Sequence, residues 1–99
     1  MIARGQIEWA LLLALKNGIE KNSISVDPED VRSVCIAKGF YDKKNFATNF
    51  KKEGNAKYFS GPMVPQGASQ QLSTDGQTEL GKLLETLSRW QRSNKYSKT

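Results

Sequence analysis

Residues 41–60, YDKKNFATNFKKEGNAKYFS, hold five of the chain's fifteen basic residues and three of its four phenylalanines. We expect a helix over about 43–52, because Phe46, Ala47 and Phe50 gather on one side of a 3.6-residue helix. Asp42 is placed to cap that helix by accepting hydrogen bonds from free N–H groups of the first turn. Gly54 favours the left-handed conformation that ends a helix. The sequence therefore predicts a short helix that docks through one apolar stripe.

The opposite side of this helix is expected to be polar and to face solvent. It carries Asn45, Thr48, Asn49 and Lys52, with Lys44 and Lys51 beside them. Asparagine can pair with an adenine edge through two hydrogen bonds, and lysine can contact phosphates or guanine. A solvated amphipathic helix without any ligand has the same pattern. The helix alone leaves both interpretations open.

The preceding segment carries strong helix-start signals. Asp27 is placed as an N-cap, Pro28 suits the first helical position, and two acidic residues follow beside the positive helix end. We expect a helix from Pro28 to about Lys38, ended by Gly39, with Val31, Val34 and Cys35 on its buried side. Two helices joined by a short turn with glycine form a helix-turn-helix, whose second helix enters the major groove of DNA. An αα-hairpin in a small helical bundle would look the same.

A hairpin is predicted after the basic helix. Residues 56–60 and 69–73 have strand character, and residues 61–68, GPMVPQGA, are rich in turn formers. A hairpin in this place is the layout of a winged helix, in which 61–68 would be the tip of the wing. A plain surface loop is the alternative for the tip. Residues 23–26 are either a third strand beside this hairpin or an extended connector.

Long helices are expected at both ends of the chain. Residues 6 to about 21 are apolar on more than one side, which predicts a central helix packed on two sides. Thr74 and Gln77 have the spacing of a capping box. The helix after them carries an apolar period formed by Leu80, Leu83, Leu84, Leu87 and Trp90. This face either completes the core or forms a dimer seam, and Gly81 within it indicates close packing against another helix.

Charge and composition limit the function classes. The net charge is +5, yet residues 1–40 are neutral, and the excess lies in 41–60 and in the basic end, 91–99. This distribution points to a polyanionic partner. The chain has no histidine and a single Cys35, so the sequence predicts no catalytic site, no metal site and no cofactor. We expect a cytoplasmic protein without a membrane span, with a domain over 1–90 and a disordered tail over 91–99.

Residues 6–90 together resemble the winged helix-turn-helix superfamily. The most specific piece is Leu72-Ser73-Thr74-Asp75-Gly76 followed by Leu80, which is similar to the entry of the helix after the wing in many members. The resemblance implies a mainly α fold with a small β-hairpin (α+β): a three-helix core, a wing and a C-terminal helix. Residues 61–68 depart from many DNA-binding wings because they contain no Lys or Arg.

The resemblance implies a non-catalytic module that binds double-stranded DNA, as a transcriptional regulator or an accessory domain. Its expected DNA-binding residues are Lys43, Lys44, Asn45, Thr48, Asn49, Lys51, Lys52 and Lys57. The alternative is a winged helix that binds a protein partner through Met63, Val64 and the tryptophans. A homodimer through Leu80, Leu84, Leu87 and Trp90 is compatible with both functions.

Overall fold

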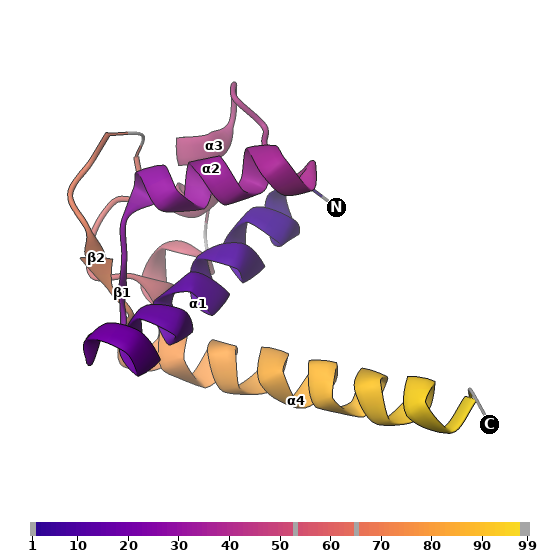
Figure 1. Ribbon diagram of the computed structural model, residues 1–99. Coiled ribbons are helices and arrows are strands. Elements are labelled where there is room, and N and C mark those ends of the chain that lie inside the picture. Colours follow the sequence, from indigo (N-terminus) through magenta and orange to yellow (C-terminus); the bar gives the residue numbers. More distant parts are fainter. Residues whose placement is uncertain (1, 53, 65, 98–99) are drawn as a thin grey trace.

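The computed structural model describes residues 2–52, 54–64 and 66–97. The chain is mainly helical with one small antiparallel sheet of two strands, in agreement with the predicted α+β class (Figure 1). The helices are α1 (Ile2–Lys21), α2 (Pro28–Lys38), α3 (Phe46–Lys51), a short 3-10 helix η1 (Ala56–Tyr58) and α4 (Thr74–Ser97). The strands are β1 (Ser25–Val26) and β2 (Gln70–Gln71). No described helix is long and apolar enough to cross a membrane.

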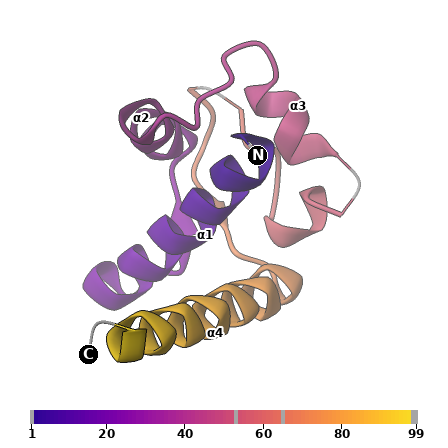
Figure 2. The same ribbon diagram turned by 90° about the vertical axis from the view of Figure 1, so that its right-hand side faces the viewer.

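Helix α1 lies at the centre of the molecule, as its apolar sequence predicts. Ile7, Leu11 and Ala14 are fully buried, and α2, α3, α4 and β1 all contact this helix. Figure 2 shows α2 and α4 on opposite sides of α1 and α3 beside the N-terminal end of α1. The core therefore forms around a helix that is covered on two sides.

Helix α2 has the predicted bounds because both of its ends are capped. The Asp27 carboxylate accepts a hydrogen bond from the Glu29 N–H at 2.9 Å, and Pro28 occupies the first turn. Gly39 ends the helix with a φ of +79°, and its N–H donates back to the last turn. A residue with a Cβ would be strained in this left-handed conformation.

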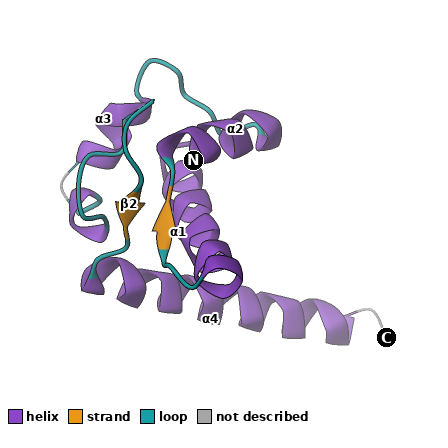
Figure 3. Cartoon of the chain, turned by 60° about the vertical axis from the view of Figure 1, so that its left-hand side comes forward, coloured by secondary structure: helices purple, strands orange, loops and turns teal. Residues whose placement is uncertain are grey.

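The sheet joins parts of the chain that are far apart in sequence. Ser25 pairs with Gln71 and Val26 with Gln70, so residues 25–26 are a strand and not only a connector (Figure 3). The prediction of a strand over 56–60 is wrong for residues 56–58, which form η1. Only Phe59 forms a bridge, to Leu72.

A local reason for η1 is that two of its carbonyl groups accept hydrogen bonds from Ser73, the residue before α4. The Ser73 hydroxyl donates to the Lys57 carbonyl, and the Ser73 N–H donates to the Tyr58 carbonyl at 2.9 Å. Gly76 lies so close to this carbonyl that a Cβ there would be 2.2 Å from the oxygen. The predicted pairing of residues 56–60 with residues 69–73 is therefore reduced to one bridge, between Phe59 and Leu72, next to the start of α4.

The segment predicted as a wing tip folds back onto the body. Met63 is only 2% exposed and belongs to the apolar core, so it cannot contact a partner as the protein-binding alternative required. Gln66 adopts a φ of +62° and lies beside Glu29 and Arg32 of α2. Burial of the methionine explains why the loop does not project as a free wing.

Helix α4 differs from the prediction at both ends. Its cap is Ser73 and not Thr74, because the Ser73 hydroxyl accepts the Gly76 N–H at 3.0 Å. The helix continues to Ser97, so residues 91–97 are helical where we expected a disordered tail. Among the described residues no atom lies within 4 Å of a Cβ added at Gly81, so the close packing expected there is not found within this part of the chain.

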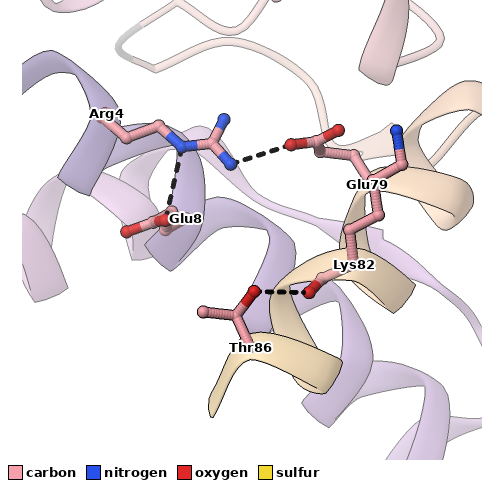
Figure 4. Close-up of polar contacts among 5 residues, drawn as sticks. All are labelled: Arg4, Glu8, Glu79, Lys82 and Thr86. Carbon is pink, nitrogen blue, oxygen red and sulfur yellow. Dashed lines mark hydrogen bonds and ion pairs between the residues drawn. The ribbon is translucent and has the colours of Figure 1, made fainter. Parts of the chain in front are cut away.

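The leucine face of α4 is buried only in its first half. Leu80 and Leu83 are in the core, whereas Leu84 and Leu87 are exposed. The side chain of Trp90 lies outside the described part of the structure. Near the start of α4, Glu79 accepts a hydrogen bond from Arg4 of α1 at 2.8 Å, and Arg4 also binds Glu8 (Figure 4).

Candidate functional site

The basic segment begins with a turn, followed by a helix shorter than predicted. Helix α3 starts at Phe46, so the expected helix over about 43–52 is too long at its N terminus. The N-cap position of α3 is Asn45, so Asp42 lies three residues before it and does not cap this helix. The Asp42 carboxylate accepts the Asn45 N–H at 3.3 Å and the Asn45 side-chain amide at 3.1 Å. These bonds hold residues 43–45 in a separate turn before the helix.

A continuous row of aromatic rings fixes this segment to the core. The ring centroids of Tyr41 and Phe46 are 5.8 Å apart, those of Phe46 and Phe50 are 5.2 Å apart, and those of Phe50 and Phe59 are 5.6 Å apart. All three phenylalanines are buried, as the predicted stripe requires for Phe46 and Phe50. Tilted and edge-on ring pairs of this kind add to the free energy of apolar burial. The row holds both the turn and α3 in one orientation.

Two buried amides link α3 to α1. Asn49 is 3% exposed, and its side-chain amide donates to the side-chain oxygen Oε1 of Gln6 at 3.2 Å. The Gln6 amide in turn donates to the Phe40 backbone carbonyl at 2.8 Å. Asn55 closes the other end by donating to the Asn49 carbonyl at 2.9 Å. The prediction that Asn49 faces outward to meet a base edge is therefore wrong.

The helical angles explain this error. At 100° per residue, Asn49 lies about 80° from the centre of the Phe46–Phe50 stripe, which is the same angle as Ala47 on the other side. Position 49 is thus at the edge of the buried face and not opposite to it. The signal for its burial was Gln6, an amide on the apolar face of α1 that needs a partner when buried.

The other seven predicted residues are exposed, and they occupy the turn, α3 and the segment after it. They are Lys43, Lys44, Asn45, Thr48, Lys51, Lys52 and Lys57. Thr48 and Lys51 are three residues apart on the outer side of α3, and the Lys57 ammonium lies 5.9 Å from the Tyr58 ring centroid. Among the residues that the structure describes, no carboxylate forms an ion pair with any of the five lysines. All five lysines therefore lie on the exposed surface of the described part of this segment.

A shallow cavity of about 310 Å³ lies at the start of the basic segment. It is lined by Glu29, Arg32, Tyr41, Lys43 and Gln66. The Arg32 guanidinium donates to the Tyr41 hydroxyl at 3.3 Å, and this hydrogen bond, with the neighbouring Glu29 carboxylate, raises the pKa of Arg32. The contacts with Tyr41 and Glu29 hold the Arg32 guanidinium at the lining of the cavity that also includes Lys43.

Sequence reasoning missed Arg32, Tyr41 and Gln66 as neighbours of Lys43. The predicted bounds of α2 place Glu29 and Arg32 on one side of that helix, so part of the signal was present. The approach of Gln66 depends on the folded-back loop, which the sequence did not reveal.

The chain was compared with models of protein families, with curated proteins and with solved structures, and none of the three comparisons finds a match. Within the described ranges, no group of three or more Cys, Asp or Glu side chains is placed to hold a metal ion.

Proposed function

We propose that the protein is a non-catalytic module that binds double-stranded DNA through the exposed side of α3 and its two flanks. The observation that carries the proposal is the set of five exposed lysines, none of them in an ion pair with a described carboxylate, on a segment that a row of buried rings holds rigid. Phosphate contacts by lysine release counterions, and this release supplies most of the affinity of non-specific DNA binding.

The element order supports a winged helix-turn-helix architecture for this module. Helices α2 and α3 follow one another through a short connection. Strand β2 pairs with β1, and Leu72, the residue after β2, forms a bridge to Phe59. In that architecture α3 is the helix that enters the major groove. We do not assign DNA contacts to residues 61–68, because Met63 anchors this loop in the core.

The short α3 limits how much sequence this interface can read. Six residues span about 9 Å at 1.5 Å each. Thr48 is the exposed polar residue within α3 that suits a base contact, and the lysines suit phosphates. We therefore expect binding that depends strongly on salt and weakly on base sequence.

The test is to titrate the protein into a labelled DNA duplex of random sequence and to measure binding by fluorescence anisotropy at several salt concentrations. If five phosphates are neutralised, log K falls with log[salt] at a slope of about −4 to −5. Replacing Lys44 and Lys52 by alanine should reduce that slope by about 2, and replacing both by glutamate should abolish binding at moderate salt.

The matched control is the same double reversal at Lys16 and Lys21, two exposed lysines of α1. It changes the net charge equally but lies outside the proposed interface, so it should retain most of the affinity. The proposal fails if the wild-type protein shows no binding at low salt and micromolar concentration. It also fails if both reversals weaken binding to the same extent.

A further inference from the structure

The shallow cavity at the start of the basic segment brings together cations from two elements. Arg32 of α2 and Lys43, the first lysine of the basic segment, both line it. Glu29, Tyr41 and Gln66 complete the lining. The cavity of about 310 Å³ therefore lies where α2 and the turn before α3 meet, two parts that follow one another in the chain (Figure 1). An anion in this cavity would meet positive charge from both sides.

The Arg32 guanidinium is oriented and still has unused donors. Its Nε–H donates to the Tyr41 hydroxyl at 3.3 Å, and its central carbon lies 5.5 Å from the centroid of the Tyr41 ring. Its terminal nitrogen Nη1 is 3.8 Å from Glu29 Oε1, which is too far for a hydrogen bond. Among the described residues, the two terminal nitrogens therefore make no hydrogen bond. Such a planar pair of donors matches the oxygens of a phosphate.

The other lining groups suit an anion with several oxygen acceptors. The Tyr41 hydroxyl accepts from Arg32 and keeps its own proton to donate, and Gln66 offers a side-chain amide. Arg32 and Lys43 bring two positive charges against the single negative charge of Glu29, a formal balance of +1. Glu29 Oε2 is enclosed and has no hydrogen-bond partner among the described residues. This carboxylate therefore acts on an anion through its charge and not through a hydrogen bond.

We propose that the cavity binds one phosphate group of the DNA backbone, with Arg32 and Lys43 as its partners and Tyr41 as the residue that positions Arg32. The inference rests on the proposed function and extends its interface from α3 to α2. Lys43 belongs both to the cavity and to the exposed lysines of the basic segment. This continuity favours a phosphate of the duplex over a free phosphate ion.

Salt titrations of duplex binding test the role of Arg32. Arg32→Gln should lower the slope of log K against log[salt] by about 0.9, the share of one phosphate, and lower the affinity roughly fivefold to tenfold near 0.1 M salt. Arg32→Lys keeps the charge and should restore the slope.

Tyr41→Phe tests the positioning role, because it keeps the aromatic ring and removes the hydroxyl that holds the guanidinium. It should weaken duplex binding about twofold to fivefold without changing the salt slope, since Arg32 must then be ordered on binding. In the Arg32→Gln background the same change should have no further effect, because it acts only through Arg32.

An ion pair on α4 provides the matched control. Glu85 and Arg89 are exposed and paired one turn apart, and Figure 2 shows α4 across α1 from α2. Arg89→Gln should keep the wild-type slope, and Glu85→Gln should keep the wild-type affinity. Glu29→Gln removes the negative charge of the cavity, so it should raise the affinity by up to about fivefold. Urea unfolding checks that each variant is folded.

The Arg32 Nε–H signal in a proton–nitrogen correlation spectrum of the wild-type chain identifies the source of the phosphate. The duplex should shift this signal, and inorganic phosphate at the same total phosphate concentration and ionic strength should not. A shift with inorganic phosphate alone would overturn the proposal in favour of a free anion. If the wild type binds the duplex and Arg32→Gln binds it with the same slope and affinity, this inference alone is wrong. A wild-type chain that binds no duplex refutes the proposed function as well.

Discussion

The buried amide pair between α1 and α3 gives the sharpest prediction about stability. Gln6→Met keeps the length of the side chain but removes its amide. The Phe40 carbonyl, now 2.8 Å from the Gln6 nitrogen, and the Asn49 amide, 3.2 Å from the Gln6 oxygen, would both lose their partner. A buried polar group without a hydrogen bond costs about 1–3 kcal/mol. We expect Gln6→Met to lower the free energy of unfolding by about 2–4 kcal/mol.

A double-mutant cycle with Asn49→Leu separates this mechanism from loss of packing. Asn49→Leu alone leaves the Gln6 oxygen without a donor, which should cost about 1–3 kcal/mol. The double variant leaves only the Phe40 carbonyl unpaired. Its loss should therefore be smaller than the sum of the single losses by about 2–4 kcal/mol, because the Asn49 amide and the Gln6 side-chain oxygen are unpaired only in the single variants.

Urea unfolding followed by circular dichroism measures each term of this cycle, with stability changes read from the midpoint at constant slope. Gln71→Met is the control, at an exposed glutamine of β2 whose side chain makes no hydrogen bond with the described residues, and it should stay within about 0.5 kcal/mol of the wild type. Strictly additive losses, or a Gln6→Met variant as stable as the control, would refute the role of the amide pair.

Three further predictions concern single sites. Gly76→Ala should destabilise the protein in urea unfolding, because the added Cβ meets a carbonyl oxygen at 2.2 Å, whereas Gly81→Ala should stabilise it by about 0.5–1 kcal/mol. The hydrogen bond from Arg4 lowers the pKa of Glu79, so the stabilisation is present above the ordinary glutamate pKa and is lost as the pH falls through the lowered value. Arg4→Met should therefore cost up to about 1 kcal/mol at pH 7 and progressively less as the pH falls below the ordinary glutamate pKa, as urea unfolding over that pH range would show. Burial raises the pKa of Cys35 to about 11, so stability should decline as the pH rises above the ordinary thiol value of 9.0, and a thiol reagent should react only after unfolding.

The predictable parts of this fold are those fixed by local chemistry. Asp27, Pro28 and Gly39 determine α2 through contacts within a few residues, and its bounds were predicted correctly. The start of α4 was missed by one residue because Ser73 and Thr74 are both good caps. The serine is used because its hydroxyl also reaches the Lys57 carbonyl, which is a tertiary contact.

The placement of a site residue could be predicted where it depends only on the polarity of the side chain. It could not be predicted where it depends on a hydrogen-bond partner far away in the sequence. Seven of the eight expected residues are exposed, as their polar character indicates. Asn49 is buried because Gln6, 43 residues away, provides its partner. The folded-back loop similarly depends on the burial of Met63. Neither contact leaves a periodic signal in the sequence.

The central position of α1 has a consequence for synthesis of the chain. The ribosome releases this apolar helix before α4, which contacts α1 and begins only at Thr74. Translation adds roughly 5–20 residues per second, so several seconds pass between synthesis of α1 and synthesis of the last residues that cover it. During translation the nascent chain therefore exposes Ile7 and Leu11, and this interval is when a chaperone would have most to bind.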